Sequence, residues 1–319
     1  MGTEPPSRPY TDSCCWRIWI KLLCGDIRCP PSSVIGPILF LVYINDLPDV
    51  VLSKTRLFAD DTVIYSTSDN YEQLQKDLKA LQIWESDWSM EFNPLKCEHV
   101  KFSRKRTKGT DHQYSLHDIN IPKTDSVKYL GVKLESSLRW NDNTTYISNK
   151  ASSRLGYIRR TIPPTLPQLR AKAYTTLVRP ILEYAATVWD GSLTQTQAVK
   201  LEAVQRRAAR TVYNIPRTDH QTSTTQLIDQ LSWQTLDMRR NCRRLGLFRA
   251  IHFNEVATDM TEYIQLHPHS VSTRRHSQQY LIPHCNTDLH KKSFFISTAK
   301  LWNNLVSDCT LLVGPPVAG

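Results

Sequence analysis

The chain has 319 residues, of which 40% are hydrophobic and 22% are charged, and its formal net charge is +10. This composition excludes an intrinsically disordered chain, and the length allows two or three domains with hydrophobic cores of their own. Residues 139–250 contain 18 Lys or Arg and 7 Asp or Glu, an excess of +11, so the rest of the chain sums to −1. A positive charge confined to one segment indicates a phosphate-bearing partner, and a solvated basic helical bundle is the simpler alternative.

The eight cysteines are scattered along a chain long enough to fold without disulfides. We therefore expect a reducing, intracellular compartment, nuclear or cytoplasmic, and no secretion. The apolar run 16–24 is interrupted by Arg17 and Lys21 and is too short to cross a membrane, so no membrane partner is expected. Two groups of potential zinc ligands lack the spacing of a compact zinc site. They are Cys14, Cys15, Cys24 and Cys29, and His267, His269, His276, His284, Cys285 and His290.

In chain order, residues 1–31 are rich in Pro and Cys and show no clear period, so we expect this segment to be poorly ordered. The apolar run 38–44 has a length compatible with either a helix or a strand. Residues 56–65 predict a strand, a tight turn and a second strand, with Asp60-Asp61 at the centre. A helix follows, with one apolar face made by Tyr71, Leu74, Leu78, Leu81 and Trp88.

Further strands are predicted at 96–102, around Ile119 and at 127–134. Beyond Trp140 the pattern turns helical, and Pro163-Pro164 should end the first helix. Additional helices are predicted at 168–178, 181–188, 196–212, 236–251 and 297–305.

The adjacent carboxylates Asp60 and Asp61 indicate a particular chemistry. Nucleotidyl transfer uses two divalent cations, which activate the attacking hydroxyl and steady the triphosphate. Mg²⁺ prefers carboxylate oxygens, and a tight hairpin is a rigid mount for them. A cation between the two carboxylates also relieves their mutual repulsion. A plain polar turn remains the alternative.

At this point the sequence resembles a known family. Phe58-Ala59-Asp60-Asp61 is similar to the catalytic hairpin of reverse transcriptases of non-LTR, LINE-type retrotransposons. Residues 33–48 resemble the palm helix motif that precedes the hairpin, residues 90–97 the following palm motif, and residues 129–132 the strand that grips the primer. Residues 232–240, 293–295 and 301–303 resemble the carboxy-terminal regions of jockey-like elements.

The resemblance implies roles for individual residues. Asp60 would be the chief Mg²⁺ ligand with Asp61 supporting it, and Lys96 would assist the leaving pyrophosphate, unless it is a solvated strand-edge lysine. Three residues would contact the nucleotide and template, namely Ser33, Phe58 and Ala59. Three would position the primer end, namely Tyr129, Leu130 and Gly131. An RNA template and DNA primer would be gripped through phosphates by Arg206, Arg207, Arg210, Arg239, Arg240, Arg243 and Arg244.

Two departures from the family bear on activity. Its palm carries a third aspartate on an earlier strand, and here Asp12 and Asp26 lack apolar strand surroundings. Pro30-Pro31-Ser32 stands where the family has Pro-Gln-Gly. We therefore expect a carboxy-terminal fragment that needs the missing amino-terminal half of the polymerase and does not polymerise DNA alone.

The expected fold is α+β, a truncated antiparallel polymerase palm followed by a helical thumb. The expected division is an atypical amino-terminal segment (1–31), a partial palm (32–138), a basic thumb and connection (139–250) and a carboxy-terminal region (251–319). The expected function is that of a retrotransposon RNA-directed DNA polymerase fragment. The alternative is a non-catalytic nucleic-acid-binding protein derived from a retrotransposon.

Overall fold

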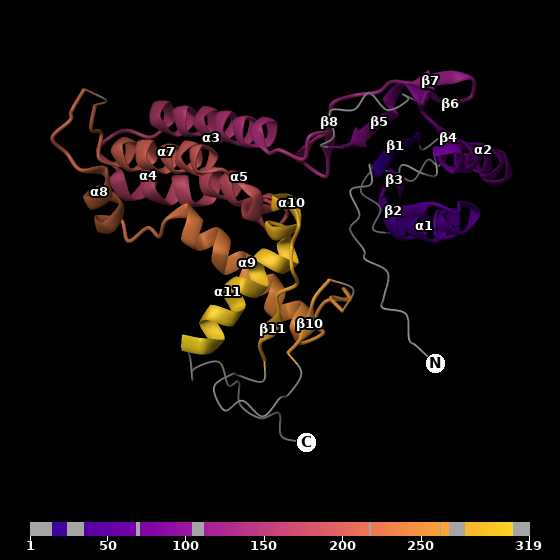
Figure 1. Cartoon of the computed structure of the whole chain (residues 1–319). Helices are drawn as coiled ribbons and strands as arrows, with labels where there is room; N and C mark the ends of the chain where they lie inside the picture. Colours follow the sequence, from indigo (N-terminus) through magenta and orange to yellow (C-terminus); the bar gives the residue numbers. More distant parts are fainter. Residues whose placement is uncertain are drawn as a thin grey trace. The chain divides into compact units, whose positions relative to one another are not determined.

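The structure is a computed structural model, and it describes residues 15–23, 35–67, 71–103, 112–216, 218–261, 263–267 and 278–308. Helices and small antiparallel sheets make up these residues, so the predicted α+β class is confirmed (Figure 1). The chain divides into two compact units, Met1–Arg139 and Trp140–Gly319. Among the described helices, none is long and apolar enough to cross a membrane.

The first unit is organised around one antiparallel sheet. Its strand order is β2-β3-β1-β4, and β5 also pairs with β1. The strands are β1 (Cys15–Leu23), β2 (Lys54–Phe58), β3 (Asp61–Thr67), β4 (Glu91–Phe92) and β5 (Glu98–Phe102). The remaining elements of this sheet unit are α1 (Ile35–Tyr43), η1 (Leu47–Val50), α2 (Tyr71–Trp88) and η3 (Pro94–Lys96). The ambiguous apolar run 38–44 is thus part of a helix, and the helix predicted after residue 70 is confirmed.

Strand β1 lies within residues 1–31, which were expected to be poorly ordered or atypical, and corrects that expectation for Cys15–Leu23. Cys15–Leu23 lies between β3 and β5 and forms backbone ladders with both. Ile18, Trp19 and Ile20 are β-branched or aromatic residues, which suit a strand. The Pro- and Cys-rich flanks obscured this pattern in the sequence.

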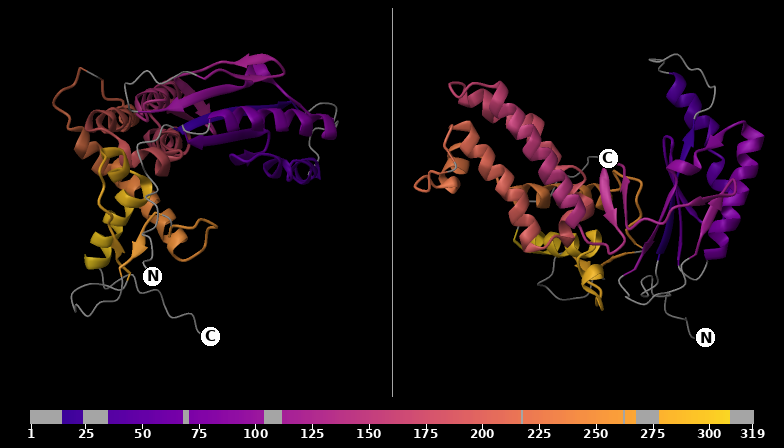
Figure 2. Two further views of the ribbon diagram at one scale, coloured as in Figure 1. Left: turned by 45° about the vertical axis from the view of Figure 1, so that its right-hand side comes forward. Right: turned by 90° about the horizontal axis from the view of Figure 1, so that it is seen from above.

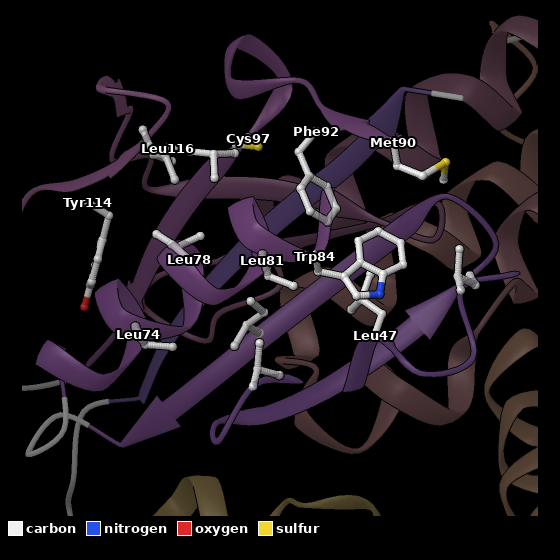
Figure 3. Close-up of a cluster of buried hydrophobic side chains, with 14 residues drawn as sticks. Leu47, Leu74, Leu78, Leu81, Trp84, Met90, Phe92, Cys97, Tyr114 and Leu116 are labelled. Atoms are coloured by element: carbon white, nitrogen blue, oxygen red, sulfur yellow. The ribbon is translucent and has the colours of Figure 1, made fainter. Parts of the chain in front are cut away.

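One face of the sheet is covered by helix α2. Leu74, Leu78 and Leu81 are fully buried at helical spacing, and they pack in one cluster with Phe92 and Ile64 (Figure 3). This repeat of apolar residues every three or four positions is what places the helix on the sheet.

A buried carboxylate on α2 also organises the entry into β2. Asp77 is 2% exposed and accepts hydrogen bonds from the backbone N–H groups of Leu52 and Ser53, both at 3.0 Å. The loop before β2 is thereby fixed to the helix that covers the sheet.

Two small hairpins complete the first unit, β6 (Tyr114–Leu116) with β7 (Ile119–Ile121) and β8 (Ser126–Tyr129) with β9 (Val132–Glu135). The strand predicted at 127–134 is therefore divided into two by a turn. Leu130 and Gly131 have φ values of 45° and 83°, as a tight turn with two left-handed residues requires. Gly131 adopts the left-handed conformation without steric cost, and the chain reverses direction there.

The second unit is helical. Its principal helices are α3 (Asn141–Thr161), α4 (Pro167–Ala173), α5 (Arg179–Glu183), α6 (Ala186–Trp189), α7 (Gln195–Val212), α8 (Thr224–Gln230), α9 (Leu236–His252) and α11 (Phe294–Asp308). Shorter elements are the π-helical turn η4 (Tyr174–Val178), η5 (Asp190–Ser192), α10 (Asp288–Lys291) and the strand pair β10 (Gln265–Leu266) and β11 (Tyr280–Leu281). Helices α3 and α7 lie side by side (Figure 2).

The helix predicted at 181–188 is interrupted. Ala185 has a φ of 49° and separates α5 from α6. The carbonyl of Tyr184, which a continuous helix would bond internally, instead accepts a hydrogen bond from the buried Trp189 indole at 3.1 Å. A tertiary contact therefore satisfies the group that the break releases.

Arg170 ties the carboxyl ends of two helices together. Its side chain is buried and donates to the carbonyls of Ile162 (2.8 and 3.0 Å) and Thr211 (2.7 Å). These carbonyls close α3 and α7, where the negative end of each helix dipole favours a cation. This arginine satisfies backbone groups rather than a carboxylate.

A separate apolar cluster forms around the last helix. Phe248 and Ile251 of α9 pack against Ile296, Ala299 and Trp302 of α11. Figure 1 shows α11 crossing α9, and the two helices are in contact. The amphipathic helix predicted at 297–305 is confirmed within the longer α11.

Candidate metal and nucleic-acid sites

The predicted carboxylate hairpin is formed by β2 and β3. Phe58 pairs with Asp61 at the end of the ladder, which leaves Ala59 and Asp60 as the two turn residues. Ala59 has a φ of 50°, the left-handed conformation that tight hairpin turns demand of one or both central residues. Asp60 and Asp61 are thus carried on a short, sharply turned segment.

The hairpin is anchored at its base and open at its tip. Val63 and Ile64 of β3 are buried, whereas the Phe58 side chain is 61% exposed. Asp60 and Asp61 are half-buried. The two residues therefore lie at the boundary between the core and solvent.

The strand next to the hairpin carries no acidic residue. Lys21 of β1 pairs in register with Asp61 of β3, and Cys15–Leu23 contains neither Asp nor Glu. Within the described ranges, no group of three or more His, Cys, Asp or Glu residues is placed to hold a metal. Of the predicted metal ligands, Asp60 and Asp61 thus lie next to each other at the turn. Ser33, the predicted nucleotide contact, lies outside the described residues.

Lys96 is not on a strand as predicted. It ends the short helical turn η3, which Asn93 caps by accepting the backbone N–H of Leu95 at 3.0 Å. Lys96 is exposed, and β5 begins two residues later at Glu98. The Asn-Pro sequence sets up this turn, because proline occupies its first position without losing a needed hydrogen bond.

Tyr129, Leu130 and Gly131 form the tip of the β8–β9 hairpin. Tyr129 is half-buried and packs against the small apolar cluster of Val63, Val100, Phe102 and Val127. Of the three predicted primer-contacting residues, Tyr129 thus ends β8, and Leu130 and Gly131 are the turn residues.

The arginines of α7 form contacts within the helical unit. Arg207 donates to the Ser152 hydroxyl of α3 at 2.8 Å. Arg210 donates to the carbonyls of Pro216 and Asp219, each at 2.8 Å, and so holds the loop that follows the helix. Arg206 makes only a 3.5 Å hydrogen bond to a carbonyl of its own helix. Of the three, Arg206 has the least internal engagement.

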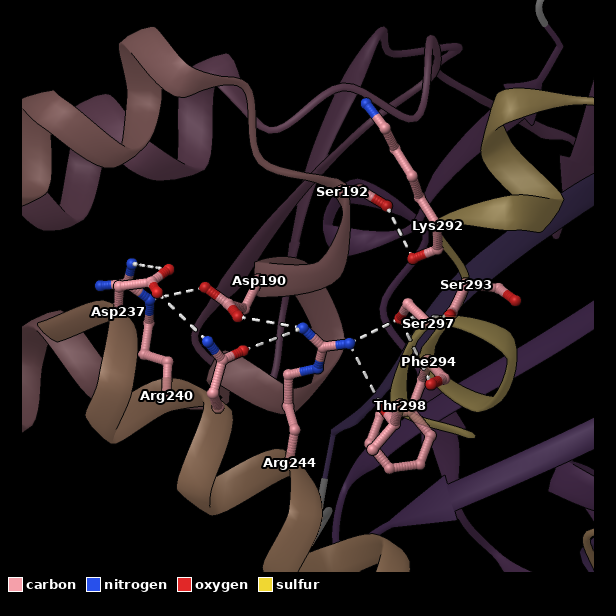
Figure 4. Close-up of polar contacts among 11 residues, drawn as sticks. Asp190, Ser192, Asp237, Arg240, Arg244, Lys292, Ser293, Phe294, Ser297 and Thr298 are labelled. Atoms are coloured by element: carbon pink, nitrogen blue, oxygen red, sulfur yellow. Dashed lines mark hydrogen bonds and ion pairs between the residues drawn. The ribbon is translucent and has the colours of Figure 1, made fainter. Parts of the chain in front are cut away.

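Two arginines of α9 are buried, contrary to the expectation that they form an exposed basic surface (Figure 4). The Arg240 side chain is 0% exposed and its Nε donates to Asp190 at 2.6 Å. Arg244 is 6% exposed and donates to Asp190 at 3.2 Å and to the Ser297 hydroxyl at 2.6 Å. Arg240 therefore links α9 to η5, and Arg244 links α9 to both η5 and α11. The physical reason is that Asp190 offers a carboxylate within the core.

The other two arginines of α9 meet a second buried carboxylate. Glu183 of α5 is 1% exposed and accepts hydrogen bonds from Arg239 through both carboxylate oxygens. Arg243 donates to the same carboxylate at 2.8 Å, although its own side chain is 52% exposed. The hydrogen bond to Glu183 is the main factor that raises the pKa of Arg239.

A further basic surface was not singled out from the sequence. Lys150, Arg154, Arg159 and Arg160 are exposed on α3, and Tyr157 between them is 50% exposed. After Asp142 the helix contains no acidic residue. The clustering of Arg154, Arg159 and Arg160 near the helix end was the available signal.

Comparison with known proteins supports the family resemblance. Residues 27–134 match the family described as reverse transcriptase (RNA-dependent DNA polymerase). The chain is 25% identical over 205 residues to the RNA-directed DNA polymerase from mobile element jockey of Drosophila melanogaster, covering 59% of this chain and 22% of that protein. It is 27% identical over 203 residues to the probable RNA-directed DNA polymerase from transposon BS of the same organism, covering 59% of this chain and 22% of that protein.

A third relative, the probable RNA-directed DNA polymerase from transposon X-element of Drosophila melanogaster, is 25% identical over 195 residues, or 57% of this chain and 21% of that protein. The chain thus spans about a fifth of the length of these curated relatives. Residues 27–134 are thus similar to the reverse transcriptase family, and the predicted resemblance to non-LTR retrotransposon polymerases is confirmed.

Proposed function

We propose that this chain contributes part of the palm and the thumb of a retrotransposon RNA-directed DNA polymerase. The observation that carries the proposal is the pair of carboxylates at the hairpin turn, Asp60 and Asp61, inside the segment that matches the reverse transcriptase family. In this proposal residues 32–138 are palm, residues 139–250 are thumb and connection, and residues 251–319 are the carboxy-terminal region.

Asp60 and Asp61 would hold Mg²⁺ in the assembled enzyme. The donor set fits, because Mg²⁺ usually takes one or two carboxylates and completes its shell with waters and substrate phosphates. When bound, the metal stabilises the charge on the attacking and leaving oxygens. The hairpin's own contribution is to fix the two carboxylates at a turn held by buried strand residues. Lys96 is proposed to assist the leaving group, and its exposure is compatible with that role.

The chain is proposed not to extend a primer by itself. The observation that supports this is Lys21 on β1, at the register position opposite Asp61, in a strand without acidic residues. A polymerase site with two metals needs a further ligand, and the sequence Cys15–Leu23 contains no carboxylate to supply it.

Primer extension tests the inactivity directly. The purified chain is incubated with an RNA template, a DNA primer, deoxynucleotides and Mg²⁺, and no extension product is expected. Extension that disappears on Asp60→Asn would overturn the proposed inactivity and would support the polymerase assignment.

Nucleic acid is proposed to bind the helical unit through phosphates. The contacts are assigned to the accessible arginines of the predicted set, Arg206, Arg239 and Arg243, and to the exposed basic residues of α3. Arg207 and Arg210 are assigned internal roles, as are Arg240 and Arg244. Binding of this kind releases counterions and weakens steeply as salt rises. A filter-binding titration with a salt-independent affinity would contradict it.

A second candidate is a nucleic-acid-binding protein without catalysis. The absence of an acidic residue from Cys15–Leu23, the strand paired with the hairpin, favours it, because a two-metal site would lack a further ligand there. The two candidates differ at Asp60→Asn: the variant loses divalent-metal binding in the polymerase reading and changes nothing in the other.

A further inference from the structure

Three arginines of the helical unit converge on one buried carboxylate. Arg179 and Glu183 belong to α5, and Arg239 and Arg243 belong to α9, each pair being four residues apart on its own helix. Residues at this spacing lie on the same face of a helix, so the two helices bring four charges together where they pack.

The distances show that the carboxylate does not satisfy all three cations. Glu183 accepts from Arg243 at 2.8 Å and from Arg239 through both oxygens, whereas Arg179 Nε lies 3.9 Å from it. Arg179 makes no hydrogen bond to any other described residue, and Arg243 uses only one nitrogen. Several N–H donors of the cluster are therefore left for a ligand.

The charge of the cluster is also unbalanced. Three guanidinium groups against one carboxylate leave a net charge of +2. The nearby acids are engaged elsewhere, since Asp190 binds Arg240 and Arg244. Asp237 lies 3.8 Å from Arg240, and Glu202 accepts the backbone N–H of Asp237 at 3.1 Å.

The cluster opens to solvent on one side. Glu183 is 1% exposed, but the side chains of Arg179, Arg239 and Arg243 are 22%, 25% and 52% exposed. Burial, followed by repulsion from Arg239, lowers the pKa of Arg179. An anion entering from the exposed side would relieve that repulsion.

We propose that Arg179, Arg239 and Arg243 form a binding site for a phosphate monoester dianion, with Glu183 fixing the geometry of the arginines. A phosphate monoester carries about −1.5 to −2 at pH 7, which matches the excess charge better than the single charge of a backbone phosphodiester. Its oxygens also accept paired guanidinium N–H groups. The source is either free inorganic phosphate or the 5′-terminal phosphate of a strand, and only the second source rests on the proposed function.

The experiment compares a 5′-phosphorylated single-stranded oligonucleotide with its 5′-hydroxyl counterpart, both labelled at the 3′ end, by fluorescence anisotropy. The full chain should bind the phosphorylated form about tenfold more tightly. Arg179→Gln and Arg243→Gln should each remove that preference. Arg249→Gln is the matched control, because Arg249 lies on the same helix, is 55% exposed and pairs at the surface with Glu255.

Inorganic phosphate separates the two sources. It should raise the Tm of the parent chain and of the control variant more than that of either cluster variant, and it should abolish the preference for the phosphorylated oligonucleotide. A phosphate-dependent Tm without an oligonucleotide preference supports the site with free phosphate as ligand.

Two results together would overturn the phosphate monoester site and leave the proposed nucleic-acid binding intact. The chain would bind both oligonucleotides equally, and phosphate would change the Tm of the parent chain and of the cluster variants by the same amount. If the parent chain binds neither oligonucleotide, the proposed nucleic-acid binding is overturned instead. The effect of phosphate on the Tm of the parent chain and of the cluster variants then still decides whether the phosphate site exists. Arg243→Gln keeps the test interpretable if Arg179→Gln fails to fold, because Arg243 is the most exposed of the three.

Discussion

The buried pair of arginines on Asp190 makes the helical unit depend on a single carboxylate. Asp190→Asn removes that charge and leaves Arg240, at 0% exposed, and Arg244, at 6%, without their ionic partner. Arg240 has no other hydrogen bond that could replace this ion pair, because its Nη1 and Nη2 already lack hydrogen-bond partners among the described residues. Its remaining acid, Asp237, lies 3.8 Å away and is 64% exposed.

The expected cost follows from the burial of the charges. Breaking a buried ion pair by removing one partner costs about 3–5 kcal/mol, because a charge is left in a poorly solvating environment. For a urea slope of roughly 2 kcal/mol/M, a loss of about 4 kcal/mol lowers the unfolding midpoint by about 2 M. A domain whose total stability is about 5–15 kcal/mol loses much of it.

Urea unfolding followed by circular dichroism measures this change, and Asp237→Asn is the matched control. The control removes the same charge from an exposed partner and should cost no more than about 1 kcal/mol. Replacing Arg240 by Met in the Asp190→Asn background should recover part of the loss, since one unpaired buried charge is removed. Equal destabilisation by Asp190→Asn and Asp237→Asn would refute the assignment of Asp190 as the internal counter-ion.

Three further outcomes are expected. In thermal melts, Gly191→Ala should destabilise the packing of α11 by about 1–3 kcal/mol, because a Cβ there would lie 2.8 Å from the carbonyl oxygen of Lys292. The control variant Gly246→Ala, with nothing within 4 Å of its added Cβ, should be neutral or stabilising. Burial lowers the pKa of His252 below its ordinary value of 6.5, so the folded state binds fewer protons than the unfolded state. The free energy of unfolding should therefore fall as pH drops below about 6.5. The same pH dependence of the free energy of unfolding in His252→Gln would contradict this. Ala59→Gly should leave stability within about 0.5 kcal/mol or raise it, whereas Ala59→Val should cost more than about 1 kcal/mol, as measured by urea unfolding, because of the left-handed backbone at φ 50°.

Local signals explain what could be predicted from the sequence. The carboxylate hairpin was predictable because strand-forming residues flank a polar turn, and α2 because its leucines recur with helical spacing. The hairpin at Leu130-Gly131 was missed, since a leucine in a left-handed conformation gives no turn signal of its own. Strand β1 was missed because its flanking composition concealed a short run of strand-forming residues.

The fate of the arginines could not be predicted locally. Asp190 and Glu183 lie 50 to 60 residues before the arginines that they bind, so only the packing of α5, η5 and α9 brings them together. A basic helix was read as a surface because charge usually indicates solvent exposure. The exposed basic residues of α3 form no ion pair with another residue that the structure describes, and the sequence alone does not distinguish them from the buried arginines.

Divalent-metal binding at the hairpin tests the central claim most directly. Mn²⁺, used as a spectroscopic substitute for Mg²⁺, is titrated into the chain and its free concentration is followed by electron paramagnetic resonance. Asp60→Asn and Asp61→Asn should each weaken binding by about tenfold or more, since even outer-shell changes alter metal affinity by roughly 10–100-fold. Asp118→Asn, which removes the same charge from the exposed turn between β6 and β7, should leave binding unchanged. Equal binding by all four proteins would contradict the assignment of Asp60 and Asp61 as metal ligands.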